Sequence, residues 1–410
     1  MNAAPAGIEL ENPWKQKDRL PKASVKHIIL AAVMCLVSAV GIPLCGHAWF
    51  GPLAVVLALC FYVVFAARSP FSILIILLTA FSTMAIGVGI PGVSVVLSLI
   101  VGAMTLAYLL TLIKHFYLAF LIPLAGFGIV FALSGDWRFS LLALVFVPAG
   151  ILLAVATLGA KPRTAAICFT AAGFLISLLT LFGVWVYSET GGFGREQILA
   201  VIEAVKDAVM QQIEPIREEI FALAKESQNP SAMQLAEAFA AMYSEEMIMQ
   251  LMQLVPAVAV VACSILAFDA QLLLGMNYFS TGLGELVPKQ ARIFNMSLTA
   301  AVLYAASFLL LLFMPTGSLA AAVMQNLSLI LMPGFALLGI RGLAISFSRA
   351  RGGFRVFLIL FVGAMLCCSS ELIFYILGLW GAYGRISEAV QRRILEKMIQ
   401  NGNDSSDGEE

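Results

Sequence analysis

Charged side chains are scarce in this chain of 410 residues, because Lys, Arg, Asp and Glu make up only 12% of it, against about 25% in soluble domains. Its 24 basic residues balance its 24 acidic residues, so no excess of positive charge indicates nucleic-acid binding. Hydrophobic residues make up 61% of the sequence, and the mean hydropathy is +0.96. We therefore exclude an ordinary soluble domain and expect a membrane protein that has the lipid bilayer as its main partner and binds no nucleic acid.

Residue groups that support catalysis or metal binding are also missing. The three histidines, His27, His47 and His115, lie far apart, and there is no Cys-x-x-Cys, His-x-x-x-His or carboxylate pair at ligand spacing. The seven cysteines lie in or beside apolar runs, without the framework of a disulfide-stapled secreted domain. The sequence thus predicts no catalytic residues, no metal site and no cofactor, and we do not expect an enzyme.

What the sequence has in abundance is apolar runs of about 17 to 30 residues, long enough to cross a hydrocarbon core about 30 Å thick. The runs lack the alternation of membrane strands, and backbone groups in lipid must be satisfied within each segment, so we expect helices. Seven runs precede a polar break and four follow it, which predicts an all-α polytopic fold with about 10 to 12 transmembrane helices. The runs are 28–45, 51–67, 71–90, 93–113, 116–134, 139–157, 165–187, 253–275, 296–314, 318–347 and 354–383.

The polar break divides the chain into five predicted parts. They are a cytoplasmic segment at 1–27, a membrane domain at 28–187, an extracytoplasmic acidic helical hairpin at 188–252, a membrane domain with four or five spans at 253–384, and a cytoplasmic tail at 385–410 with a basic helix and an acidic, disordered end. The first run follows 27 polar residues with no cleavage-like region, so we interpret it as a retained helix rather than a signal peptide.

Basic residues in the short loops predict the orientation. Nine of them lie in loops on the same side as the N-terminal segment, and Arg138 alone lies in the opposite short loops. Because cytoplasmic loops carry the excess of Lys and Arg, the sequence predicts a protein of the cytoplasmic membrane with its N-terminus in the cytoplasm. A single crossing by 354–383 would put the basic tail outside, whereas a helical hairpin that turns near Cys367 to Glu371 would return the C-terminus to the cytoplasm. We favour the hairpin, and a tilted single helix stays the alternative.

The segment between the two membrane domains has the pattern of an amphipathic helix outside the membrane. Its apolar side chains recur at spacings of three and four, which is typical of a coiled-coil stripe. Pro215 predicts a kink in this helix, and Asn229-Pro230 predicts a turn before a second helix. The stripe either packs between the two arms of the hairpin or docks a partner, which would be another membrane protein or a second copy of the chain. Its members are Ile198, Ile202, Val205, Val209, Ile213, Ile216, Ile220 and Leu223.

Three charged residues fall inside apolar runs: Asp269, Arg341 and Glu371. A charge at the bilayer centre costs about 3 kcal/mol unless it is paired or faces a cavity, so each is a candidate functional residue. Asp269 and Arg341 are both predicted near cytoplasmic helix ends, where an ion pair between them would be structural or would belong to a polar path for a small-molecule solute. Glu371 would lie at the turn of the proposed C-terminal hairpin. Further polar residues that either line the same cavity or form interhelical hydrogen bonds are Gln271, Gln325 and Asn326.

A face of small residues marks the first predicted span. Ala31, Cys35 and Ala39 recur every four residues, and such a face lets another helix approach closely. Glycines and prolines in other runs indicate short or interrupted helices around a cavity.

The order of these features resembles the YybS-like bacterial membrane proteins, a family defined by a domain of unknown function. The similarity lies in the second half of the chain, where an outer helical insertion is followed by short motifs. They are Leu254-Val255-Pro256-Ala257, Gly339-Ile340-Arg341-Gly342-Leu343-Ala344, Leu377-Gly378-Leu379 and Tyr383-Gly384-Arg385. The N-terminal half of that family is similar to the S subunits of energy-coupling factor vitamin transporters and, more distantly, to the rod-shape scaffold protein MreD. In S subunits a small-residue face on the first helix docks the energising subunit, and Ala31, Cys35 and Ala39 match that face.

Two functions follow as expectations. A solute-binding or transport subunit fits the interrupted helices, the intramembrane charges and the resemblance to S subunits. A non-catalytic scaffold or assembly partner of the cell envelope fits the acidic helical hairpin and the missing catalytic groups.

Overall fold

The computed structural model describes residues 24–30, 32–33, 51–63, 91–112, 117–158, 163–227, 229–280, 294–315, 317–349, 351–353, 356, 358, 360 and 370–404. Within these residues the chain forms helices and no strand, which confirms the prediction of an all-helical fold. Four helical segments among them are long and apolar enough to cross a membrane: Trp137–Leu158, Arg163–Thr190, Val255–Met276 and Leu319–Arg349. Each of the four matches a run predicted from hydropathy.

The chain folds into two compact units. Unit 1 comprises Met1–Val205 and Ala262–Phe294, and unit 2 comprises Lys206–Val261 and Asn295–Glu410. Two helices, α9 (Arg195–Glu226) and α12 (Val255–Ser280), each begin in one unit and end in the other. The domain limits predicted from the sequence, near residues 188 and 253, stay predictions.

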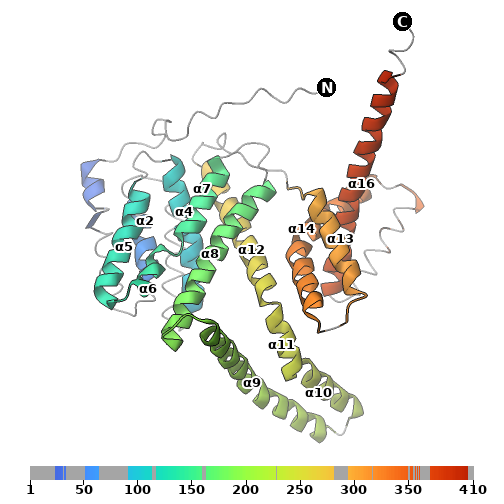
Figure 1. Cartoon of the computed structure of the whole chain (residues 1–410), viewed down its shortest axis with the longest axis horizontal. Helices are drawn as coiled ribbons and strands as arrows, with labels where there is room; N and C mark the ends of the chain where they lie inside the picture. Colours follow the sequence, from blue (N-terminus) through green and yellow to red (C-terminus); the bar gives the residue numbers. More distant parts are fainter. Residues whose placement is uncertain are drawn as a thin grey trace. The chain divides into compact units, whose positions relative to one another are not determined.

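Unit 1 consists mainly of helices (Figure 1), and most of them have apolar sequences along nearly their whole length. Besides the start of α9 and the end of α12, the helices of unit 1 are α2 (Gly51–Phe61), α4 (Pro91–Leu112), α5 (Leu118–Ser134), α6 (Trp137–Ser140), the 3-10 helix η4 (Leu141–Leu144), α7 (Val147–Leu158) and α8 (Arg163–Thr190). α4 packs against α2 and α7, and α7 packs against α8. Tyr108, Phe146 and Phe174 are fully buried in this core. Helices that are apolar on all sides are typical of buried or membrane-embedded positions.

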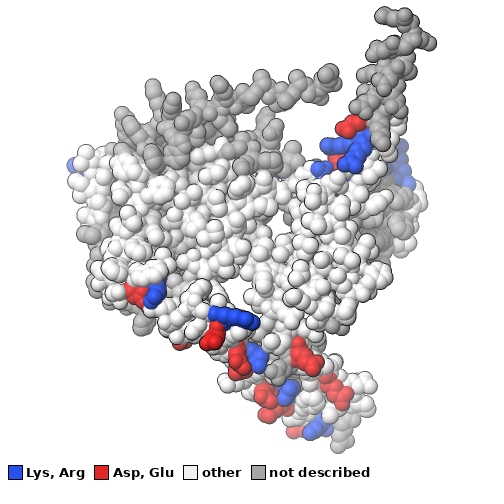
Figure 2. Space-filling view, viewed as in Figure 1, with Lys and Arg blue, Asp and Glu red and all other residues white. Residues whose placement is uncertain are grey.

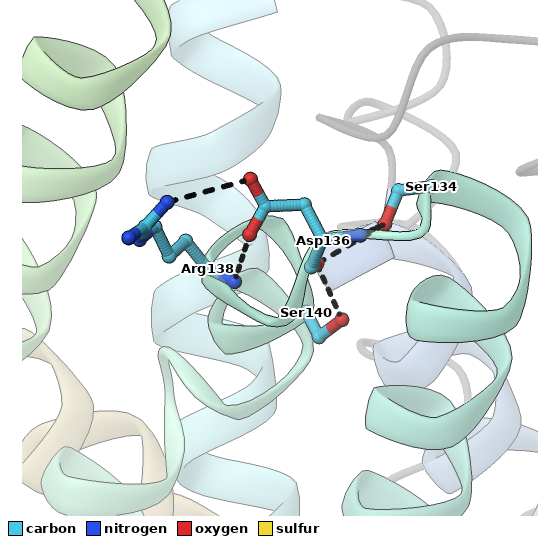
Figure 3. A network of polar contacts seen from close by, with 4 residues as sticks. All are labelled: Ser134, Asp136, Arg138 and Ser140. Carbon is cyan, nitrogen blue, oxygen red and sulfur yellow. Dashed lines mark hydrogen bonds and ion pairs between the residues drawn. The ribbon is translucent and has the colours of Figure 1, made fainter. Parts of the chain in front are cut away.

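A tight polar turn joins α5 to α6 (Figure 3). Gly135 follows α5 with a φ of 70°, in the left-handed region that favours glycine. Asp136 then begins α6, because its carboxylate accepts a hydrogen bond of 2.9 Å from the backbone N–H of Arg138. The Ser140 hydroxyl donates to the Asp136 carbonyl at 3.0 Å, and the Asp136 N–H donates to the Ser134 hydroxyl at 3.3 Å. The turn therefore satisfies backbone groups that the two helix ends leave free.

Unit 2 combines a helical hairpin with a three-helix core. Its helices are most of α9, then α10 (Pro230–Met242), α11 (Glu245–Gln253), the first turns of α12, α13 (Leu298–Leu311), α14 (Leu319–Arg349) and α16 (Ser370–Asp404). α13, α14 and α16 pack against one another around Ala301, Tyr304, Phe335 and Ala382. α16 continues without interruption to Asp404, so the basic helix predicted in the tail is the C-terminal part of this helix.

The predicted hairpin has one arm formed by α9 and a second arm formed by α10 and α11. Asn229 caps α10 by accepting a backbone hydrogen bond at 3.0 Å, and Pro230 opens the helix, which confirms the predicted turn. Ser244 caps α11 in the same way at 3.3 Å and so divides the second arm. α9 runs through Pro215 as one helix. Charges gather on this hairpin, whereas wide surfaces elsewhere are uncharged (Figure 2).

Some predicted features lie outside the described residues. They are the small-residue face formed by Ala31, Cys35 and Ala39, the span at 71–90, and the part of the proposed C-terminal turn before residue 370. Glu371 lies in the first turn of α16. The interpretations placed on these features stay predictions.

Candidate functional site

Gln271 forms an interhelical hydrogen bond within unit 1. Its Nε2 donates to the Thr170 hydroxyl on α8 at 3.2 Å. Thr170 is fully buried and donates in turn to the Ala166 carbonyl at 2.9 Å. The amide thus links α12 to α8 through one buried hydroxyl, as interhelical polar side chains do in apolar surroundings. This contact fits the interpretation of Gln271 as a packing residue better than that of a cavity-lining residue.

Asn326 on α14 lies where α11 ends and α12 begins. Its Oδ1 accepts from the Ala257 N–H at 3.1 Å, and its Nδ2 donates to the Gln253 carbonyl at 2.9 Å and to the Ala322 carbonyl at 2.8 Å. Gln253 is the last residue of α11 and Ala257 lies in the first turn of α12, so these backbone groups lack partners within their own helices. One side chain therefore caps two helix ends at the point where the hairpin joins the apolar helix α12. We call this arrangement the Asn326 clamp.

The charged candidates are divided between the two units. Asp269 is half-buried on α12 in unit 1, and Arg341 is exposed on α14 in unit 2. The ion pair between them therefore stays a prediction. Gln325, which precedes the Asn326 clamp, is exposed on α14.

α14 and α16 cross at glycine residues that leave no space for a side chain. A Cβ atom on Gly339 would overlap the Leu377 carbonyl oxygen, and a Cβ atom on Gly381 would overlap the Phe335 carbonyl oxygen. The two backbones thus lie in direct contact, which small residues permit between apolar helices. Gly339 and Leu377 belong to two motifs that carry the family resemblance, so the structure gives these motifs a shared packing role. We call this region the glycine crossing.

Tyr304 of α13 packs against the glycine crossing. Its ring is fully buried and stacks on Phe335 with the ring centroids 5.4 Å apart. The hydroxyl lies against Gly378, where an added Cβ would overlap it, and has no hydrogen-bond partner among the described residues. Sequence reasoning did not identify Tyr304, because its burial depends on the packing of three helices rather than on a local pattern.

A charged cluster on α16 holds the helix to the segment before α13. Arg385 donates through Nε to the Met296 carbonyl at 2.9 Å and through a second nitrogen to Glu388 at 2.7 Å. Arg392 donates to the other Glu388 oxygen at 2.6 Å. The hydrogen bond from Arg385 holds the pKa of Glu388 below its ordinary value, and Arg392 adds to this effect. The basic helix of the tail is therefore anchored at its start.

Arg138, the basic residue of the predicted outer loops, is neutralised by its neighbours. Its guanidinium lies 4.0 Å from the Asp136 carboxylate (Figure 3). It also lies over the Tyr187 ring, 4.1 Å from the centroid, and 5.4 Å from that of Trp137. The carboxylate and the aromatic rings both stabilise the guanidinium cation. Neighbouring groups therefore offset the charge of the single basic residue in the predicted outer loops.

The predicted apolar stripe of α9 is only partly covered. Val209, Ile216 and Leu223 have exposed fractions of 37%, 49% and 58%, and we call these three residues the α9 row. They stand seven residues apart and therefore lie on one side of the helix. The other members are half-buried: Ile198, Ile202, Val205, Ile213 and Ile220.

The second arm of the hairpin does not cover the α9 row. An open hollow of about 630 Å³ between α9 and α10 is lined by Glu218, Phe221 and Lys225 of α9 and by Ala240 of α10, among others. At 100° per residue, Glu218 lies about 160° around the helix from Ile216. The row thus lies on a different side of α9 from the residues that line this hollow, and both interpretations of the stripe stay predictions.

An apolar groove of about 330 Å³ lies in unit 1. Ile28 and Ala32 line one side of it, and residues of α2 and α5 such as Val55 and Ile122 line the others. Its lining offers no charged side chain among the described residues, so it suits an acyl chain or another apolar group rather than a charged solute. No group of three His, Cys, Asp or Glu that could hold a metal ion lies in the described part of the chain.

Comparison with known protein families, curated proteins and solved structures finds no match for this chain.

Proposed function

We propose that the chain is a multi-pass protein of the cytoplasmic membrane that acts as a non-catalytic scaffold or assembly partner of the cell envelope. In this proposal the N-terminus lies in the cytoplasm and the α9–α11 hairpin lies outside, where it provides the contact surface. The observation that carries the proposal is the α9 row, which presents large aliphatic side chains on a helix that is otherwise rich in charge. Exposed apolar patches rimmed by polar residues mark interaction sites.

Two polar residues of the apolar helices support this choice over transport. Gln271 and Asn326 both serve helix packing through the hydrogen bonds described above. Each of the two therefore stabilises the packing of helices within its own unit. Membership of the YybS-like family is part of the same proposal, since that family implies no transport activity by itself.

Photo-crosslinking in intact membranes tests the proposal. A photo-reactive residue in place of Ile216 should give protein adducts heavier than the 43.9 kDa chain, because the row is covered by a partner. The same residue in place of Gln211, which is exposed about 140° around the helix from Ile216, is the matched control and should give far fewer adducts. Adducts that survive Val209→Asn with Leu223→Asn, or an absence of protein adducts at Ile216, would contradict a scaffold role of the row.

Solute binding is the second candidate, and the apolar groove of unit 1 is the observation that favours it. The groove lies beside the first predicted span, whose small-residue face would dock an energising subunit by resemblance to S subunits. The melting temperature of the purified protein should then rise when an apolar solute is added. Ala125→Phe fills the groove and should abolish that rise. An equal rise in this variant would show that the solute does not bind in the groove.

A further inference from the structure

We propose that Arg341 of α14 binds the phosphate group of an anionic phospholipid at the cytoplasmic edge of the bilayer. This inference rests on the membrane location in the proposed function and adds a ligand to it. It is carried by the exposure of Arg341, by the lack of a carboxylate partner among the described residues, and by the length of the uncharged stretch that ends at this residue.

Arg341 lies on the side of α14 that faces away from α16. At 100° per residue it stands about 160° around the helix from Gly339, which contacts α16 at the glycine crossing. Its neighbours one turn away on the same side, Leu337 and Ile345, are large aliphatic residues, and all three side chains are exposed. The guanidinium therefore belongs to an apolar surface that contacts lipid in the proposed topology.

The length of α14 places Arg341 at the edge of the hydrocarbon core. From Leu319 to Ile340 the helix carries no charged residue, over about 22 residues or about 33 Å. This length matches a hydrocarbon core about 30 Å thick. Arg341 is thus the first charge after a complete crossing, at the depth where lipid phosphates lie.

Aromatic residues of α16 indicate the same depth. The indole of Trp380 lies beside Gly342, where an added Cβ would stand 3.4 Å from its Nε1. Tyr383, about one turn further along α16, is exposed. Because tryptophan and tyrosine gather at membrane–water interfaces, these two residues support an interfacial position for the neighbouring Arg341.

The described part of unit 2 offers no carboxylate to Arg341. α13 and α14 contain no Asp or Glu. On α16, Glu371 lies in the first turn, about 13 Å along the helix axis from Trp380, and Glu388 already accepts from two arginines of its own helix. An unpaired cation beside lipid is costly, and phosphate oxygens fit the planar donors of a guanidinium.

Two further arginines favour a headgroup with net negative charge. Arg349 and Arg351 are exposed where α14 ends, and Arg349 stands about 12 Å beyond Arg341 along the helix axis. Basic residues that follow directly after a membrane span attract anionic lipids. We therefore expect anionic phosphatidylglycerol to bind better than zwitterionic phosphatidylcholine, although both carry a phosphodiester.

Two other anions compete with the lipid as partners of Arg341. One is Asp269 of unit 1, the partner predicted from the sequence. The other is free phosphate from solution, which offers the same oxygens. The aliphatic surroundings of Arg341 favour the lipid, because its acyl chains cover Leu337 and Ile345 while its phosphate reaches the guanidinium.

Native mass spectrometry of the full-length protein, released from mild detergent, tests the inference by counting the lipids that stay bound. Arg341→Gln should lower the apparent affinity for phosphatidylglycerol by about ten-fold, because charge-assisted hydrogen bonds are lost. Arg341→Lys keeps the charge without the planar donors and should give an intermediate affinity. Arg393→Gln removes another exposed arginine of unit 2 and is the matched control, with an expected change below about two-fold.

The fold of the variant is checked separately. Without added lipid, Arg341→Gln should keep the circular dichroism and the melting temperature of the unchanged protein, because the side chain is exposed. An affinity for phosphatidylglycerol equal to that of the unchanged protein would then contradict the inference.

The competing anions give different results. Tighter binding of phosphatidylglycerol by Asp269→Asn would show that Asp269 neutralises Arg341 in the unchanged protein. Displacement of the lipid by inorganic phosphate would identify free phosphate as the ligand. Equal retention of phosphatidylcholine would show that the charge of the headgroup is not recognised. Each of these three results would overturn the proposal of an anionic phospholipid.

Failure of this inference can be told apart from failure of the proposed function. Absence of the chain from carbonate-washed membranes would contradict the membrane location and therefore both proposals. Presence of the chain there, with equal lipid binding by Arg341→Gln and the unchanged protein, would contradict only the phospholipid site.

Discussion

Unit 2 contains two apolar helix faces that differ in how they are covered. At the glycine crossing, α14 and α16 lie so close that not even a methyl group fits between Gly339 and Leu377. Along the α9 row, large aliphatic side chains are 37% to 58% exposed. The first face is complete within one chain, because small residues let two backbones meet. The second is made of apolar side chains that contribute stability only when something covers them, and for this reason we propose a partner for the α9 row.

The largest expected effect is at the glycine crossing. Gly381→Ala should lower the free energy of unfolding by about 3 kcal/mol, because its Cβ meets a backbone carbonyl that cannot move without separating the helices. Thermal unfolding in mild detergent measures the change. Gly384→Ala lies on the same helix with open space around its Cβ, so it should be neutral or stabilising. Equal melting temperatures for the two variants would show that α14 and α16 are not in contact.

The Asn326 clamp should have the next largest effect. Asn326→Leu leaves the Ala257 N–H and the Gln253 carbonyl without partners and should destabilise unit 2 by about 2 kcal/mol. Hydrogen exchange should show faster opening at the junction of α11 and α12. Gln325→Leu changes the exposed neighbour and is the control; if it matches Asn326→Leu, the hydrogen bonds do not carry the effect.

A substitution of Tyr304, at the same crossing, is expected to change the stability in the opposite direction. Tyr304→Phe keeps the ring on Phe335 and removes a buried hydroxyl that lacks a partner among the described residues, so stability should stay equal or rise by about 1 kcal/mol. A melting temperature several degrees below that of the unchanged protein would mean that the hydroxyl is bonded.

A smaller effect is expected at Glu388. The pKa of the Glu388 carboxyl is lowered in the folded chain, mainly by the hydrogen bond from Arg385. The ionised side chain therefore stabilises the fold at pH values above its ordinary pKa of 4.5. This contribution is lost as the pH falls through the lowered pKa. Glu388→Gln should therefore lower the free energy of unfolding by less than about 1 kcal/mol at neutral pH, because the Glu388 side chain is 46% exposed and water screens the pair. The difference from the unchanged protein should disappear in acid, and a difference that grows in acid would contradict the assignment.

Much of the fold could be predicted from the sequence. The apolar runs around α7, α8, α12 and α14 identify helices with nearly the observed bounds, because hydropathy and length depend only on local sequence. The turn at Asn229-Pro230 was equally readable, since Asn caps a helix and Pro opens one by their own chemistry.

The contacts of the site could be predicted only in part. Asn326 could be identified as a candidate because it is a polar residue in an apolar run. Its capping of two helix ends could not be predicted, because it depends on the place where α14 meets the junction of α11 and α12. The spacing of the α9 stripe was visible, whereas its exposure was not, because coverage depends on where α10 lies. Tyr304 carries no signal in the sequence, since an aromatic residue in an apolar run is ordinary.

Thiol accessibility of the α9 row tests most directly whether a partner covers it in the membrane. Ile216→Cys should react several-fold more slowly than Gln211→Cys with a membrane-impermeant maleimide added to intact cells, and the difference should vanish once the chains are diluted in detergent. Its melting temperature should match that of the unchanged protein, because an exposed side chain contributes little to the fold. Equal labelling of Ile216→Cys and Gln211→Cys in intact cells would show an uncovered row and would contradict its role as an interface.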